Sequence, residues 1–145
     1  NTDSQPWTFS VALHTYLNVG DIHNTTTTGM GAEYIDSLQG GKICQGGDEL
    51  VLTDTIDRVY TQPEAQIFVA DKKLDRTLTV ENHGHNSAVL WNPWAEGAAS
   101  MGDMQDDGYL TIMCVESTLH APSLEAGKTL QPGESHQLIT VISAQ

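Results

Sequence analysis

Residues 7–19 (WTFSVALHTYLNV) alternate between hydrophobic and polar side chains, which is the two-residue period of a β-strand. One face is hydrophobic and is predicted to pack in the core; it carries Trp7, Phe9, Val11, Leu13 and Leu17. The other face is small and polar and includes two larger hydrogen-bonding side chains, His14 and Tyr16. That face is predicted to line a cleft or to meet solvent, although a lone strand histidine is more often solvated than catalytic.

Strand-length runs rich in β-forming residues continue to the end of the chain and are separated by turn residues. The runs are the threonine-rich stretch at 25–28 and ELVL, DRVYTQ, QIFVAD, RTLTVEN, SAVLWN, YLTIMCVES and HQLITVIS. The best helical candidate, WAEGAASMGD after Pro93, contains two glycines and is predicted to be short. This pattern predicts a single all-β domain over residues 1–145, folded as an antiparallel β-sandwich.

The chain carries 19 Asp and Glu residues against six Lys and Arg residues, which gives a formal net charge of −13. Such a field repels polyanions, so nucleic acid and anionic membranes are not expected partners. No apolar run approaches membrane-spanning length, and the first residues lack the basic and apolar regions of a signal peptide. A cytoplasmic protein is therefore predicted, and the missing initiator methionine suggests a piece of a longer chain.

Two cysteines, Cys44 and Cys114, lie far apart in the sequence among apolar neighbours. They are predicted to be buried and reduced, with a disulfide between them as the alternative. His83 and His85 in ENHGHNS resemble a metal-binding pair, but no third ligand follows at a convincing spacing. No metal site and no cofactor are therefore predicted.

Glu116 stands at the end of an otherwise apolar strand, on the face that also carries Leu110, Ile112 and Cys114. Burial at this position would raise the pKa of the carboxyl group toward the range in which it serves as both base and acid. The alternative is an edge position where the strand emerges into water, and the pattern alone favours that alternative.

Asp57 and Arg58 are neighbours in DRVY and are predicted to point to opposite faces of a strand. Asp57 could accept hydrogen bonds from substrate hydroxyl groups, and Arg58 could serve structure or bind an anion; the alternative is a surface ion pair. Trp91 and Asn92 in WNPW combine an aromatic ring with a polar group, which suits a sugar. Core packing explains the same residues equally well.

Taken in order, ALHTYLNVGDI, EYIDSL, DTIDRVY, SAVLWNPW, YLTIMCVES and LQPGESHQL resemble the D-hexose-6-phosphate mutarotases (glucose-6-phosphate 1-epimerases) of the aldose 1-epimerase superfamily. The resemblance runs nearly from end to end and corresponds to the C-terminal half of the galactose mutarotase-like supersandwich. It implies that His14 and Glu116 form an acid/base pair and that Asp57 belongs to the sugar site. The remaining substrate-site candidates are Tyr16, Trp91 and Asn92, with Arg58 for the phosphate.

The resemblance implies interconversion of the α and β anomers of a hexose 6-phosphate, with glucose 6-phosphate as the expected substrate. That reaction needs a base for the C1 hydroxyl and an acid for the ring oxygen, and it needs no cofactor. Two alternatives stay open: a non-catalytic carbohydrate-binding fragment, and an aldose 1-epimerase that acts on free sugars. Half of a sandwich would leave sheet edges unpaired, so self-association or pairing with a missing N-terminal half is also expected.

Overall fold

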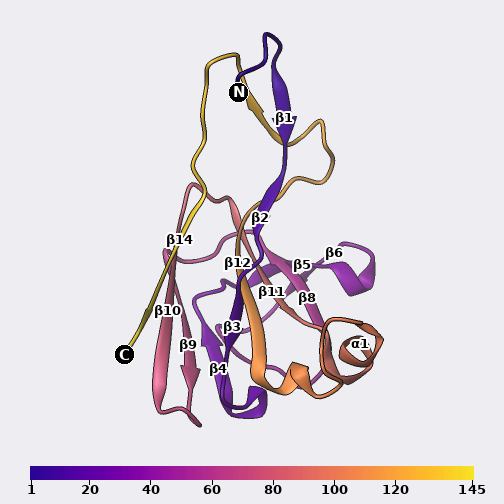
Figure 1. Ribbon diagram of the computed structural model, residues 1–145, viewed down its shortest axis with the longest axis vertical. Helices are drawn as coiled ribbons and strands as arrows, with labels where there is room; N and C mark the ends of the chain where they lie inside the picture. The colour runs from indigo at the N-terminus through magenta and orange to yellow at the C-terminus, as the bar shows by residue number, and fades with distance from the viewer.

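The computed structural model describes residues 1–145 and contains three antiparallel sheets (Figure 1). The largest sheet has seven strands: β2 (Val11–Leu13) and β3 (Tyr16–Asn18), which both pair with β12 (Ile112–Leu119), then β11 (Ser87–Asn92), β8 (Ile56–Tyr60), β5 (Glu33–Asp36) and β6 (Lys42–Gln45). The second consists of β14 (Ile139–Ala144), β10 (Arg76–His83), β9 (Gln66–Asp71), β4 (Thr25–Thr28) and β7 (Glu49–Val51). The predicted all-β antiparallel fold is confirmed.

The two larger sheets share one hydrophobic core. Alternate residues of β9 and β10 contribute one side of the core, because the pleat sends every second side chain to the same face. The other side comes from β8, β11 and β12 of the seven-stranded sheet. These five strands contribute the following side chains to the core: Ile56, Tyr60, Ile67, Val69, Leu78, Val80, Ala88, Leu90, Met113 and Val115.

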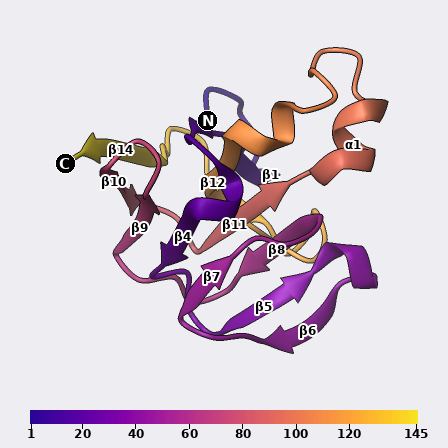
Figure 2. The ribbon, with the colours of Figure 1, turned by 90° about the horizontal axis from the view of Figure 1, so that it is seen from below.

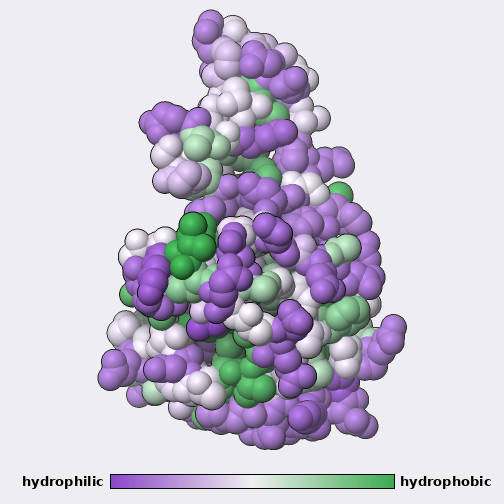
Figure 3. Space-filling view, turned by 180° about the vertical axis from the view of Figure 1, so that it is seen from behind, coloured by the Kyte–Doolittle hydropathy of each residue, from purple (hydrophilic) through white to green (hydrophobic).

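The segment that begins at Trp7 is not one continuous strand, and its hydrophobic face is only partly buried. β1 (Trp7–Phe9) pairs only with β13 (Lys128–Leu130), and this two-stranded sheet extends away from the larger sheets (Figures 1 and 3). Trp7 is 52% exposed and Val11 is 38% exposed, so their predicted place in the core is wrong. Only Leu17 of the five residues is buried, because it alone lies over the core shared by the two larger sheets.

Two further segments differ from the sequence-based expectation in a way that matters for the site. Residues 109–111 were expected to begin a strand, but they belong to the 3₁₀ turn η3 (Gly108–Thr111), which leads into β12. The predicted short helix is confirmed as α1 (Trp94–Ser100), which lies beyond the end of β11 (Figure 2). Two more 3₁₀ turns, η1 (Ile22–Asn24) and η2 (Ser37–Gln39), connect strands.

Both cysteines are free thiols, as predicted, but only Cys114 is fully buried while Cys44 is half-buried. None of the helical segments combines the length and the apolar character that crossing a membrane would require.

Candidate active site

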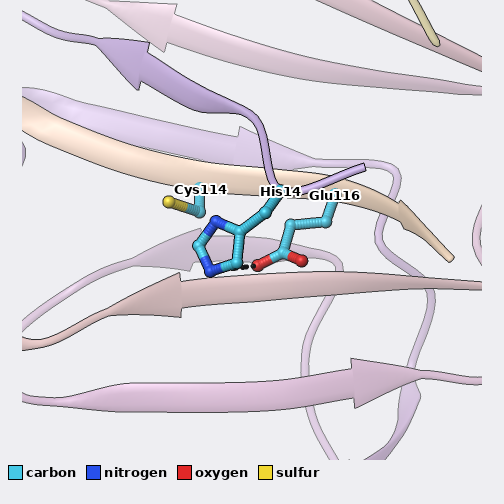
Figure 4. A group of neighbouring side chains, drawn as sticks. All are labelled: His14, Cys114 and Glu116. Carbon is cyan, nitrogen blue, oxygen red and sulfur yellow. Dashed lines mark ion pairs between the residues drawn. The ribbon is translucent and has the colours of Figure 1, made fainter. Parts of the chain in front are cut away.

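His14 and Glu116 lie opposite each other on neighbouring strands of the seven-stranded sheet. β2 and β3 pair with β12 in a single register, with Leu13 opposite Ser117 and Tyr16 opposite Cys114. Continuing this register from Leu13 by one residue places His14 opposite Glu116, in the gap between the two short strands. Their side chains meet there, with His14 Nε2 and Glu116 Oε1 3.4 Å apart (Figure 4).

The chain turns sharply at this gap. The Thr15 N–H donates a hydrogen bond of 2.9 Å to the Leu13 carbonyl, which closes a tight turn around His14 and interrupts the ladder to β12. The interruption leaves the imidazole on the same face of the sheet as Glu116, with 48% of the side chain exposed. The polar face predicted for this segment therefore does carry an accessible histidine.

Glu116 is a buried carboxylate, with only 4% of the residue exposed. β12 has a neighbour on each side, so the alternative of an edge position open to water is wrong. Burial raises the pKa of Glu116, the nearby His14 lowers it by a smaller amount, and the negative charge of Asp57 raises it further. The result is a carboxyl group that holds its proton to higher pH than an ordinary glutamate does.

Aromatic rings fix the position of the imidazole. The ring of Tyr16 stacks on His14 with centroids 4.9 Å apart, and the edge of Trp91 contacts both rings at 5.6 and 5.9 Å. Burial raises the pKa of the Tyr16 hydroxyl, with smaller contributions from Cys114, Asp103 and Glu116. These rings form an apolar wall beside the acid/base pair, the kind of surface on which the C–H face of a sugar packs.

Asp57 lies on the same face as this group. In the ladder between β8 and β11 it is opposite Trp91, and Trp91 is in turn opposite Cys114 of β12. Because residues that are directly opposite share a face, Asp57, Trp91 and Cys114 form one row across the sheet. The structure thus brings together five of the predicted site residues: His14, Tyr16, Asp57, Trp91 and Glu116.

Arg58 and Asn92 lie on the opposite face, which faces the core, and the structure does not bring them to the group. Arg58 sits 4.2 Å above the ring of Tyr34, with its Nε 4.0 Å from Asp36 Oδ2. The Asn92 amide donates to the carbonyls of Tyr109 and Ile112 at 3.0 and 2.8 Å, and its oxygen accepts from the Trp94 N–H at 2.8 Å. Asn92 therefore ties β11 to η3 and α1.

Two residues beside the site were not singled out by the sequence. Cys114 lies on β12 two residues before Glu116, and its sulfur lies beside the acid/base pair (Figure 4). Burial and then the charge of Glu116 raise the pKa of this thiol to about 12. Strand alternation does put Cys114 on the face of Glu116, although its apolar neighbours predicted only a buried thiol. Asp103 could not have been found, because it reaches Tyr16 from the loop after α1.

A hollow of about 440 Å³ continues the site from Tyr16 toward that loop. Its lining includes Met101, Asp103, Met104 and Gln105. The site as a whole offers a buried carboxyl group, an exposed imidazole, a second carboxylate and aromatic rings. This combination can move protons on a small polar substrate. His14, Cys114 and Glu116 also present three atoms that could ligate a metal ion, all within 4.8 Å of one another.

Comparison with known proteins shows which protein family the chain resembles. A family model described as aldose 1-epimerase matches residues 1–143. A Salmonella typhimurium protein named as a candidate glucose-6-phosphate 1-epimerase is 42% identical over 137 residues, which cover 90% of this chain and 44% of that protein. A Cenchrus ciliaris protein with the same name is 33% identical over 146 residues, covering 99% of this chain and 43% of its own length.

Solved structures agree with the sequence relatives. The crystal structure of a candidate mutarotase (YeaD) from Salmonella typhimurium superposes with a TM-score of 0.89 at 37% identity, covering 97% of this chain and 46% of that one. The chain thus spans less than half the length of the relatives it matches. The family match over almost every residue, together with these identities, makes this chain a member of the aldose 1-epimerase family.

Proposed function

We propose that the chain is the C-terminal half of a mutarotase that interconverts the α and β anomers of a hexose 6-phosphate, glucose 6-phosphate first among them. The observation that carries the proposal is the set of side chains on the site face. His14, Tyr16, Asp57, Trp91 and Glu116 converge there, and apart from the ion pair between His14 and Glu116 no other side chain or backbone group of the chain hydrogen-bonds to their side chains. Such groups are available to a substrate. The names of the sequence relatives support the choice of substrate.

The proposed reaction opens and recloses the sugar ring by proton transfer. Glu116 takes the proton from the C1 hydroxyl while protonated His14 gives a proton to the ring oxygen, which breaks the bond between C1 and that oxygen. Rotation about the C1–C2 bond presents the other face of the aldehyde, and the two residues exchange roles on closure. The raised pKa of Glu116 suits this exchange, because the carboxyl group must work as a base in one direction and as an acid in the other.

In this proposal the remaining residues of the site bind the sugar and orient it for proton transfer. Trp91 and Tyr16 pack against the sugar ring, and Asp57 accepts a hydrogen bond from a hydroxyl group. The phosphate contact is left to residues outside the site face, because no Lys or Arg lies among the converging side chains and Arg58 is turned toward Asp36. The same observation favours a second candidate, an aldose 1-epimerase acting on free sugars.

We further propose that the chain works in contact with the rest of a longer polypeptide or with a second copy of itself. β14 is an edge strand with exposed apolar residues, Ile139, Val141 and Ile142, and unpaired edges invite strand addition. A cytoplasmic location is proposed on the two free thiols, which persist in a reducing compartment. Light scattering at increasing concentration tests the self-association.

Magnetisation-exchange NMR on the anomeric protons tests the function. The exchange rate is measured for glucose 6-phosphate and for glucose, with and without the protein. Faster exchange of the phosphate ester alone supports the hexose 6-phosphate mutarotase. Faster exchange of both sugars supports the aldose 1-epimerase. Acceleration of neither, together with a sugar-dependent shift of the Trp91 indole resonance, would instead indicate a carbohydrate-binding fragment.

A further inference from the structure

Three side chains with different ligand chemistry converge at the centre of the site face. The imidazole nitrogen of His14, the sulfur of Cys114 and a carboxylate oxygen of Glu116 all lie within 4.8 Å of one another (Figure 4). Cys114 and Glu116 are two residues apart on β12, so the pleat directs both to the same face. His14 approaches from the gap between β2 and β3.

The spacing is close to that of a tetrahedral zinc site. With bonds of about 2.0–2.2 Å to nitrogen and oxygen, two ligand atoms on a tetrahedral Zn²⁺ are roughly 3.3 Å apart. His14 Nε2 and Glu116 Oε1 are separated by 3.4 Å and meet that requirement as they stand. The sulfur lies up to 4.8 Å from the other two atoms, so it has to approach them by up to roughly 1.2 Å to reach tetrahedral spacing, and the proposal requires the Cys114 side chain to rotate toward them.

We propose that His14, Cys114 and Glu116 form a binding site for a borderline-soft divalent cation, Zn²⁺ in particular, which blocks the site rather than serving it. The thiol gives its proton to water as the ion binds the sulfur, the imidazole nitrogen and the carboxylate oxygen, and no oxidation takes place. A water molecule fills the fourth position, because the exposed side of His14 leaves it open. Binding does not depend on the proposed function; only the blocking of proton transfer rests on it.

The ligand set makes the site selective. Thiolate and imidazole ligands favour Zn²⁺ and Co²⁺ over Mg²⁺ and Ca²⁺, which prefer oxygen. Other histidines and cysteines of the chain are poorer candidates for metal ligands. His83 is already paired with Glu81 at 2.8 Å, and Cys44 lies on a different strand, β6. No other group of three such residues comes together in the structure.

Titration of the reduced 145-residue chain with Co²⁺ tests the proposal, because a cobalt–thiolate bond absorbs in the near ultraviolet. We expect one equivalent of Co²⁺ to produce the absorption and Zn²⁺ to displace it. Cys114→Ser should abolish the absorption and weaken Zn²⁺ binding by at least about tenfold, since even an outer partner of a ligand contributes that much. Cys44→Ser, which removes the only other thiol, should leave both unchanged.

A second variant is needed because Cys114 is buried and Cys114→Ser could fail to fold. His14→Ala changes a half-exposed side chain and should keep the fold, while weakening Zn²⁺ binding by a similar factor. Absence of the absorption in the wild-type chain, or its survival in Cys114→Ser, would overturn the proposal. So would Zn²⁺ affinity that His14→Ala leaves intact. Because these are binding measurements, they decide the metal site even where no sugar exchange is detected.

Discussion

The two faces of the seven-stranded sheet differ in how they hold their buried carboxyl and amide side chains. On the core face, Asn92 makes three hydrogen bonds, and Asp36 accepts two from backbone N–H groups and one from Gln39. On the site face, Glu116 is nearly as buried as these residues yet accepts no hydrogen bond, and its closest charged partner is His14 at 3.4 Å. Leaving a buried carboxyl group without a hydrogen bond costs stability, and in the proposed function Glu116 keeps its oxygens for the substrate.

The largest effect is expected from removing the charge of Glu116. Glu116→Gln should slow anomer exchange by about 10²–10⁴-fold, the usual value of a general acid/base, because an amide cannot take the C1 hydroxyl proton. Stability should change little, since no hydrogen bond within the chain is lost. Exchange NMR and urea denaturation measure the two quantities. Glu81→Gln, on the other large sheet, is the matched control and should keep the wild-type exchange rate. If the two variants exchange the anomers at equal rates, Glu116 has no part in the mechanism.

The core face should show the reverse behaviour. Asn92→Ala removes three partly buried hydrogen bonds and leaves the carbonyls of Tyr109 and Ile112 without their amide donor, so the free energy of unfolding should fall by about 2–4 kcal/mol. Asn18→Ala is the control, because the Asn18 side chain is exposed and makes one long hydrogen bond of 3.4 Å. Urea denaturation compares them. A loss below that of Asn18→Ala would show that the two faces do not differ as described.

Asp57→Asn sharpens the comparison within the site face. Turnover should fall by roughly tenfold, because the loss of one hydrogen bond to the substrate costs about 1.4 kcal/mol and that free energy corresponds to a tenfold change in rate. Asp57 also raises the pKa of Glu116 through its charge, so the acidic limb of the pH profile should move to lower pH in the variant. The two readouts separate substrate binding from electrostatics. If the acidic limb of the pH profile lies at the same pH in Asp57→Asn and in the wild-type protein, the carboxyl groups of Asp57 and Glu116 do not interact.

The smallest effect is expected at Arg58. Arg58→Gln breaks the contacts with Tyr34 and Asp36 and should cost about 1 kcal/mol of stability, because the ion pair is long and the side chain is partly exposed. The ratio of exchange rates for glucose 6-phosphate and glucose should not change. A selective loss with the phosphate ester would assign Arg58 to the phosphate after all.

Periodicity was sufficient to predict the strands that cross the shared core and the polar face that carries His14, whereas the pairing of His14 with Glu116 followed only from the family resemblance. It failed where burial depends on distant partners. Trp7 and Val11 alternate like core residues, yet Trp7 lies on β1 outside the larger sheets and Val11 lies at the end of β2, outside the shared core. The neighbours Trp91 and Pro93 predicted a place for Asn92 in the sugar site, but its role is set by the carbonyls of Tyr109 in η3 and Ile112 at the start of β12. Such contacts leave no local pattern.

The cross-strand arrangement of His14 and Glu116 has a consequence for how the protein folds. About a hundred residues separate the two along the chain, so their meeting closes a long loop and carries a large entropic cost. Hairpins such as β9–β10 and β11–β12 join nearer neighbours, and we expect them to form earlier. The acid/base pair therefore belongs to the late events of folding, and partly folded chains should contain stable sheet but no competent site.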